Sequence, residues 1–317
     1  MSVQTDKPVT VHTPEFRESM RVGVVRVYDG LKHDLPLIAA DVQRWMRALA
    51  GGNEPANYFL HPVAFPLMLL PWWLEQQVSG VSTPDFQADL IFSNASLYYY
   101  VRLVDNVMDG HATVEQKLLP ATGYFVNQFH SAYHKYFEIG HPFWDYFEHA
   151  WAEFCDVTAA DGHLTDVDDR TFTNLVGRKV CAAKISVAAV CFHHQHSELI
   201  PLWSEWIDVF GCWHLFREDL FDWQQDLTLG AVTYLLSEAG RRKADDEPVV
   251  SWLAREGMDW GFEQLRGWMQ RLRQMTFASQ EVLAYLDFRE RELFEHREKI
   301  RSGLELIHRL SGSDRRG

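Results

Sequence analysis

Helical periodicity constrains the fold of this chain more than any other feature, because it recurs along almost the whole sequence. Apolar residues return every three or four positions in one segment after another, which is the pattern of an amphipathic helix. Alternating strand patterns are nearly absent, and VGVVRVY at 22–28 is the only tempting one. We therefore predict an all-α protein with helices near residues 36–49, 62–78, 86–109, 114–138, 141–157, 168–197, 200–227, 231–241, 247–256, 259–285 and 287–311.

The chain shows no obvious point of division. Its 317 residues could form two domains, but no internal repeat and no low-complexity linker interrupts the helical runs. We predict one helical domain over residues 1–317, built as a bundle around a central cavity. The polar ends, residues 1–15 and 311–317, are expected to be flexible.

The sequence also bears on location. The N-terminus lacks the basic and then apolar layout of a signal peptide, and no apolar stretch is long enough to cross a membrane. We expect a cytoplasmic protein without a membrane span. The cysteines lie in apolar helical contexts without CxxC spacing, so we expect reduced core thiols at Cys155, Cys181, Cys191 and Cys212.

Charge and aromatic content narrow the range of partners. The formal net charge of −14 disfavours nucleic acid and anionic membranes, so an anionic substrate would need a metal ion or a few well-placed basic residues. Aromatic residues make up 14% of the chain, which fits either a Trp-rich core or a cavity whose π faces stabilise a cation. Composition alone leaves these alternatives open.

Two carboxylate motifs suggest the chemistry. The first lies at the end of the 86–109 helix, where Asp105 and Asp109 are four residues apart and therefore share a face. Like charges at the C-terminal end of a helix oppose the helix dipole, so helix stability does not explain them. A bound divalent cation would explain why two carboxylates lie there. A lone acidic pair could still be an ordinary solvated face.

The second motif is FREDLFDWQQDLTLG at 216–230. Its acidic residues again fall on one helical face, among aromatic neighbours, and Arg217 adds a cation beside them. Carboxylate oxygens suit Mg²⁺, which also takes oxygens from a substrate phosphate. Two such faces opposed across a cleft could hold several Mg²⁺ ions against a diphosphate and make it a leaving group. The metal ligands that we predict are Asp105, Asp109, Glu218, Asp219, Asp222 and Asp226.

These motifs resemble those of the class I isoprenoid synthase superfamily: prenyl diphosphate synthases, squalene and phytoene synthases, and class I terpene cyclases. The resemblance covers roughly residues 86–235. The first motif is similar both to D-D-x-x-D, with Asn106 in place of the second Asp, and to the Y-x-x-x-R-x-x-D-x-x-x-D of phytoene synthases. Tyr98 and Arg102 supply the first part of the latter pattern, and Gly230 and Tyr234 follow the second motif much as in phytoene synthases.

The resemblance implies an all-α fold, Mg²⁺ as cofactor and a prenyl diphosphate as substrate. Basic residues before the second motif correspond in kind to a diphosphate-sensing position, which an Arg or a Lys can fill. The substrate-binding residues that we predict are Arg102, Arg178, Lys179, Lys184, Arg217 and Tyr234, and the catalytic ones are Asp105, Asp109, Asp222 and Arg178. A homodimer is compatible with the family pattern.

The sequence departs from the motifs of chain-elongating prenyl synthases and of bacterial terpene cyclases, and these departures determine which reaction we expect. GGNEPANYFLHP stands where chain-elongating synthases have the cationic G-G-K-R-x-R-P, so a second diphosphate lacks its usual partners. The N-S-E motif and the C-terminal Arg-Tyr pair of bacterial cyclases are also missing. We hypothesise ionisation of one allylic diphosphate followed by cyclisation or proton loss, as in a terpene synthase. The alternatives are a prenyltransferase, coupling two prenyl units or alkylating another acceptor, and a non-catalytic helical subunit.

One further cluster attracts attention. The HHQH run contains His193, His194 and His196, but no second cluster lies at zinc-like spacing. We therefore do not predict a zinc site there.

Overall fold

The all-helical prediction is confirmed. The structure is a computed structural model, and it describes residues 12–61, 64–108, 115–275 and 279–313. Within those ranges the chain forms helices joined by turns, and no strand is present. None of the described helices combines the length and the apolar character that crossing a membrane requires.

The residues group into two compact units. The first unit comprises Met1–His149 and Ala183–Ile200, and the second comprises Ala150–Ala182 and Pro201–Gly317. The chain therefore passes from one unit to the other three times. The single-domain assignment stays a prediction.

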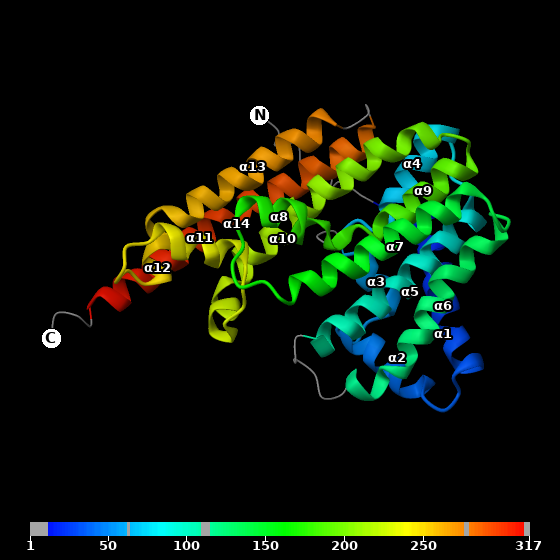
Figure 1. The fold of residues 1–317 in the computed structure, drawn as a ribbon, viewed down its shortest axis with the longest axis horizontal. Helices are drawn as coiled ribbons and strands as arrows, with labels where there is room; N and C mark the ends of the chain where they lie inside the picture. The colour runs from blue at the N-terminus through cyan, green and yellow to red at the C-terminus, as the bar shows by residue number, and fades with distance from the viewer. Residues whose placement is uncertain (1–11, 62–63, 109–114, 276–278, 314–317) are drawn as a thin grey trace, which may run out of the picture. The chain divides into compact units, whose positions relative to one another are not determined.

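In the first unit the long helix α5 is surrounded by other helices. It packs against α1, α4, α6 and α9, and Figure 1 shows α1, α5 and α6 running close together. Helices α1 and α5 approach closely at Gly23, where a Cβ atom would lie 2.6 Å from Cγ2 of Ile91. The elements of this unit are α1 (Pro14–Asp34), α2 (Ala39–Leu49), α3 (Pro55–Phe59), α4 (Leu69–Ser79), α5 (Pro84–Met108), η1 (Glu115–Leu118), α6 (Pro120–Ser131), η2 (Ala132–Lys135), the first part of α7 (Pro142–Asp161), α9 (Ala183–His193) and η4 (Ser197–Leu199).

Helix α1 was not expected from the sequence. The strand-like stretch at 22–28 lies inside it. Thr13 caps the helix by accepting a hydrogen bond from the Phe16 N–H, Pro14 occupies the first turn, and Lys32 sits in the last turn. Caps and buried positions at helical spacing therefore outweigh the β-branched run. The polar N-terminal segment accordingly becomes helical from Pro14, and α14 continues into the C-terminal segment as far as Ser313.

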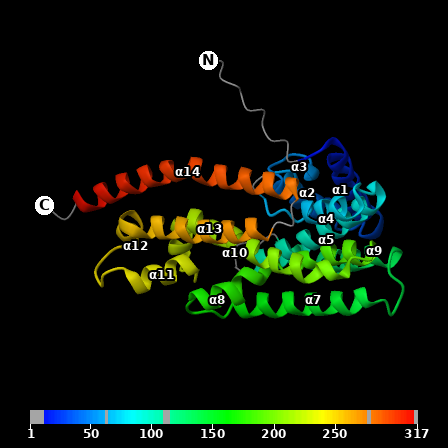
Figure 2. The ribbon, with the colours of Figure 1, turned by 90° about the horizontal axis from the view of Figure 1, so that it is seen from above.

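The second unit contains the long helix α10, and Figure 2 shows α13 and α14 as long neighbouring helices. The helix expected at 168–197 is divided: Leu175 leaves helical geometry between α8 and η3, and α9 begins only at Ala183, in the first unit. The elements are the remainder of α7, then α8 (Asp169–Asn174), η3 (Val176–Val180), α10 (Ile200–Leu229), α11 (Tyr234–Arg242), α12 (Val249–Trp252), the π-helical turn η5 (Leu253–Gly257), α13 (Met258–Gln274) and α14 (Gln280–Ser313).

Much of the aromatic content belongs to the cores of the two units. Trp203, Trp206 and Trp213 of α10 are fully buried, and Trp72 and Trp73 of α4 are buried as well. These five tryptophans therefore belong to a Trp-rich core. The cysteines are free, but the prediction of core thiols is wrong for one of them: Cys155 is exposed, because it lies on the outer face of α7, whereas Cys181, Cys191 and Cys212 are buried.

Candidate functional site

The second carboxylate motif forms an acidic stripe on α10. Phe216, Leu220 and Trp223 of the same segment are buried, so the helix has an apolar face and an acidic one. Gly261 of α13 allows close packing there, since a Cβ atom at that position would lie 2.7 Å from Cδ1 of Leu220. The acidic face consists of Glu218, Asp219, Asp222 and Asp226.

Asp219 caps the following helix. Its Oδ2 accepts a hydrogen bond of 3.2 Å from the backbone N–H of Tyr234, and the N–H of Leu235 contributes a second one. Thr233 accepts from the N–H of Leu236, so the first turn of α11 is satisfied by two side chains. Burial and the nearby charge of Asp226 raise the pKa of Asp219 well above its ordinary value, although the backbone donors oppose the rise.

Asp222 and Asp226 have a different environment. Asp222 is exposed and Asp226 half-buried, and neither has an ion-pair partner among the residues that the structure describes. Burial and the charge of Asp222 raise the pKa of Asp226. A pair of carboxylates that repel each other and have no protein cation fits a hard divalent cation such as Mg²⁺.

The carboxylates do not by themselves form a closed metal cage. In the described part of the chain, no three His, Cys, Asp or Glu side chains are placed so that they could hold a metal ion. An ion at Asp222 and Asp226 would therefore keep water ligands or take oxygens from a substrate, as Mg²⁺ commonly does.

Glu218 is attached to a buried polar cluster that the sequence reading missed. His214 Nε2 lies 3.4 Å from Glu218 Oε1, one helical turn earlier on α10. Burial, Arg289 and Arg217 lower the pKa of His214 well below its ordinary value, so the imidazole is neutral. The i, i+4 spacing of His214 and Glu218 was visible in the sequence, but the burial of the histidine was not.

Arg217 points to α14 and not along the acidic stripe. Its guanidinium lies 2.9 Å from Glu292 and over the ring of Phe221. Arg289, fully buried on α14, donates to the hydroxyl of Tyr285 at 2.6 Å and lies over the ring of Trp213. Substrate binding by Arg217 stays a prediction.

The cations of η3 are paired with carboxylates of α7. Arg178 forms an ion pair with Glu153, and Lys179 Nζ lies 2.6 Å from Asp161. All four side chains keep between a quarter and two-fifths of their surface exposed. Pairs of this kind contribute little to stability, so a more highly charged ligand can replace the carboxylate partner.

The first motif is described in part. Asp105 on α5 lies 3.4 Å from Arg102, and both side chains are about one-third exposed. Asp109 lies outside the described residues. One turn before Arg102, Tyr98 packs against Tyr58 of α3 with ring centres 5.2 Å apart, and their hydroxyls are hydrogen-bonded. Lys184 on α9 is only 5% exposed.

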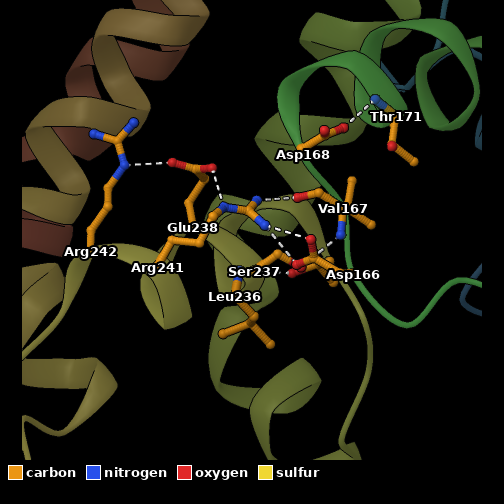
Figure 3. A network of polar contacts seen from close by, with 10 residues as sticks. Asp166, Val167, Asp168, Thr171, Leu236, Ser237, Glu238, Arg241 and Arg242 are labelled. Atoms are coloured by element: carbon orange, nitrogen blue, oxygen red, sulfur yellow. Dashed lines mark hydrogen bonds and ion pairs between the residues drawn. The ribbon is translucent and has the colours of Figure 1, made fainter. Parts of the chain in front are cut away.

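A polar network around α11 was also missed (Figure 3). Arg241 donates to both carboxylate oxygens of Asp166, at 2.6 and 2.7 Å, and to the backbone carbonyl of Val167. Its Nε donates to Glu238, which also pairs with Arg242. Asp166 and Arg241 are 75 positions apart in the sequence, so no local pattern could have joined them.

The histidine run forms ordinary structural contacts. His193 stacks on Phe86, His194 lies 3.1 Å from the buried Glu75, and His196 lies 2.9 Å from Glu198. His193 and His194 also contact each other, with ring centres 4.9 Å apart, so the run takes part in packing and ion pairs at and just after the end of α9.

Comparisons with known proteins find similarity among solved structures. No family model matches the sequence, and no curated protein matches it significantly. Among solved structures, the chain is similar to the geranylgeranyl pyrophosphate synthetase from the archaeon Geoglobus acetivorans, with a TM-score of 0.63 and 13% identity, over 88% of this chain and 99% of that one. This likeness establishes the fold of an isoprenoid synthase and confirms the fold expected from the two motifs.

Proposed function

We propose that this chain is a class I isoprenoid synthase that ionises an allylic prenyl diphosphate with the help of Mg²⁺. The fold supports this proposal, because a solved structure with the same fold is named as a geranylgeranyl pyrophosphate synthetase. The observation that carries it is the pair Asp222 and Asp226, which share a face of α10 without a cationic partner in the described residues. Carboxylates in that arrangement suit a divalent cation.

The carboxylates of both motifs are the proposed Mg²⁺ ligands. Asp222 and Asp226 would hold the ion on α10, with Glu218 and Asp219 as further oxygen donors, and Asp105 and Asp109 would do so in the first motif. When bound, Mg²⁺ neutralises the diphosphate and makes it a better leaving group. Capping of α11 already occupies Asp219, so we assign the larger part of metal binding on α10 to Asp222 and Asp226.

Basic residues are the proposed diphosphate ligands. Arg178 and Lys179 would exchange Glu153 and Asp161 for phosphate oxygens, which carry more charge and match the paired N–H groups of an arginine. Arg102 would exchange Asp105 in the same way once that carboxylate holds a metal ion. We propose Lys184 as a further point charge.

Aromatic rings of the first unit are the proposed lining around the cation. Tyr98 lies one turn before Arg102 on α5, and Tyr58 and Phe59 of α3 pack on its ring, with ring centres 5.2 and 5.1 Å away. Burial and the neighbouring Tyr58 raise the pKa of Tyr98 far above its ordinary range, so its phenol stays protonated. The rings therefore offer π faces to a cation without offering it a phenolate nucleophile.

Two fates of the cation are compatible with the chain. Cyclisation or proton loss, as in a terpene synthase, is our first proposal. The stretch GGNEPANYFLHP at 51–62 carries no Lys or Arg where chain-elongating enzymes place cations for a second diphosphate. Prenyl transfer is the second proposal. It is favoured by the likeness to a structure named as a geranylgeranyl pyrophosphate synthetase and by the Tyr98, Arg102 and Asp105 spacing.

A product assay tests both fates. Purified protein is incubated with C10, C15 or C20 allylic diphosphate and Mg²⁺, alone and together with isopentenyl diphosphate, and the products are identified by mass spectrometry. A hydrocarbon or alcohol from a single substrate supports the terpene synthase, whereas a longer diphosphate or a coupled product supports prenyl transfer. Absence of any product from either set would reject the proposed function for these substrates.

A further inference from the structure

We propose that α11 is a bracket that holds the cationic segment η3 in place against α10, and that Arg241 is its positioning residue. The inference rests on the proposed function, since it assumes that η3 binds diphosphate oxygens. All the residues involved belong to the second unit. The bracket consists of α11 (Tyr234–Arg242), which is anchored at its start through Tyr234 and at its end through Arg241.

The first anchor is at the start of α11. The backbone N–H of Tyr234 donates to Asp219 of α10, and its hydroxyl donates to Asp169 of α8 at 3.3 Å. The ring of Tyr234 also stacks on Phe172 of α8, with ring centres 4.8 Å apart. One residue, only 4% exposed, therefore contacts both the acidic helix and the helix that leads into η3.

The second anchor is at the end of α11, where Arg241 binds the loop before α8 (Figure 3). Its guanidinium spans both oxygens of Asp166 and the carbonyl of Val167, while the Val167 N–H donates to Ser237 of α11 at 3.1 Å. Isolated surface ion pairs contribute little, but a bidentate arginine within a network is the favourable exception. Glu238, nearly buried, orients the guanidinium through Nε at 2.8 Å.

The anchored loop determines where η3 begins. Asp168 follows Val167 directly and caps α8 by accepting from the Thr171 N–H at 2.7 Å. Helix α8 is six residues long, packs on η3, and is separated from it by Leu175 alone. A shift of the loop would therefore move Arg178 and Lys179, and a small displacement of such groups weakens ligand binding strongly.

Arg242 provides the matched control. It neighbours Arg241 in sequence, has similar side-chain exposure, and pairs with the same Glu238. It lies over the ring of Trp260, however, and no contact to the loop is among its interactions in the described residues. Replacing Arg241 or Arg242 by glutamine changes the net charge equally, but only Arg241 binds the loop before α8 among the contacts of the described residues.

The test measures the binding of inorganic pyrophosphate with Mg²⁺ to the full chain by isothermal titration calorimetry. We expect Arg241→Gln to raise the Kd about tenfold, the low end of what outer-shell partners of a metal site cause. Arg241→Lys should recover part of the affinity, and Arg242→Gln should bind as the wild type does. Hydrogen exchange should rise in residues 162–180 of Arg241→Gln and not in Arg242→Gln.

Asp166→Asn changes the carboxylate that Arg241 binds, and Asp166 lies at an exposed loop position. This variant therefore tests the bracket if Arg241→Gln does not fold. The same loss of affinity in Asp166→Asn supports the bracket. Wild-type affinity in a folded Arg241→Gln, or in Asp166→Asn, overturns it. Failure of the wild-type chain itself to bind pyrophosphate with Mg²⁺ would instead overturn the proposed function.

Discussion

Neighbouring aspartates on α10 differ in what they do for the protein. Asp219 closes the first turn of α11 through backbone hydrogen bonds, whereas Asp222 and Asp226 lie along the more open part of the same face. A helix cap typically contributes about 1 kcal/mol to stability. Asp219 therefore combines a folding role with the proposed metal role, and its substitution would not separate the two.

Asp226→Asn isolates the proposed metal role. The exchange removes one negative charge from a half-buried position that has no ion pair in the described residues, so the fold should persist. We expect the rate of pyrophosphate release from the substrate to fall by more than about tenfold, because losing an outer-shell partner of a metal site already costs about tenfold. The Mg²⁺ concentration that gives the half-maximal rate should rise.

Asp246→Asn is the matched control, because it removes the same charge from an exposed loop between α11 and α12. It should leave both quantities unchanged. Equal rates in Asp226→Asn and Asp246→Asn, at every Mg²⁺ concentration, would contradict the assignment of Asp226.

A second residue-scale prediction concerns Asp89 in the first unit. It is 5% exposed and accepts hydrogen bonds from Lys135, Tyr136 and Arg26. Burial opposes its charge, but these donors outweigh burial and lower the pKa of Asp89 below its ordinary value. A carboxyl group whose pKa is lowered by folding stabilises the folded state above its unfolded pKa, about 3.9, and this stabilisation is lost as the pH falls towards the folded pKa.

Asp89→Asn should therefore lower the free energy of unfolding at neutral pH by about 2 kcal/mol, less than for a fully buried pair because Arg26 and Lys135 are partly exposed. The difference from the wild type should shrink below about pH 4, as the wild-type carboxyl group protonates. Urea unfolding across this range measures both effects. Asp29→Asn, at an exposed pair with Lys32, should show neither, and a difference that stays constant with pH would contradict the prediction.

How far the sequence predicts residue roles depends on the separation of the partners. The carboxylates on one face of α10 follow from spacing within a single helix, so they could be predicted. Two other contacts could not be predicted, because they join segments that come together only on folding. Arg241 binds Asp166, and Asp219 caps α11. Burial of His214 likewise depends on the packing of α14, which periodicity does not specify.

At the scale of elements, the approach of η3 to α10 is controlled by two glycines. A Cβ atom on Gly211 would collide with the carbonyl group of Gly177, and one on Gly177 would collide with Sγ of Cys212. The contact involves η3, the 3₁₀ segment that follows the break in the helix expected at 168–197. Periodicity of apolar residues continues through the break, so the sequence suggested one helix where the structure has three.

Gly211→Ala should disturb this crossing. Overpacking typically costs about 1–3 kcal/mol, and here the neighbour that must move is backbone beside Arg178. We expect a lower free energy of unfolding and weaker binding of pyrophosphate with Mg²⁺. Thermal unfolding and calorimetry measure the two effects.

Gly267→Ala is the control on α13, where a Cβ atom would meet nothing within 4 Å. It should stabilise the protein by about 0.5–1 kcal/mol, as alanine does in a helix interior, and leave binding unchanged. A Gly211→Ala protein as stable as Gly267→Ala would contradict the close crossing.

At the scale of the whole molecule, fold class was the most predictable property. Helical periodicity extends over most of the chain, and the likeness to an isoprenoid synthetase structure covers 88% of it at only 13% identity. The pattern of the two motifs therefore conveyed the fold where overall sequence similarity could not. The division into two compact units was not foreseen, because no linker or change of composition marks it.

The net charge of −14 makes a further demand on the molecule as a whole. A diphosphate approaching such a protein meets overall repulsion, which local cations must overcome. The basic residues proposed as its ligands are paired with carboxylates in the structure, as Arg178, Lys179 and Arg102 show. Divalent cations are therefore expected to be essential for substrate binding as well as for the departure of the diphosphate.

The most direct measurement is pyrophosphate release by the wild-type protein from C10, C15 and C20 allylic diphosphates, in Mg²⁺ and in EDTA. We predict release from at least one of them in Mg²⁺, its loss in EDTA, and its recovery when excess Mg²⁺ is restored. Release that is equal in Mg²⁺ and EDTA, or no release from any of the three with or without isopentenyl diphosphate, would contradict Mg²⁺-dependent ionisation of an allylic diphosphate.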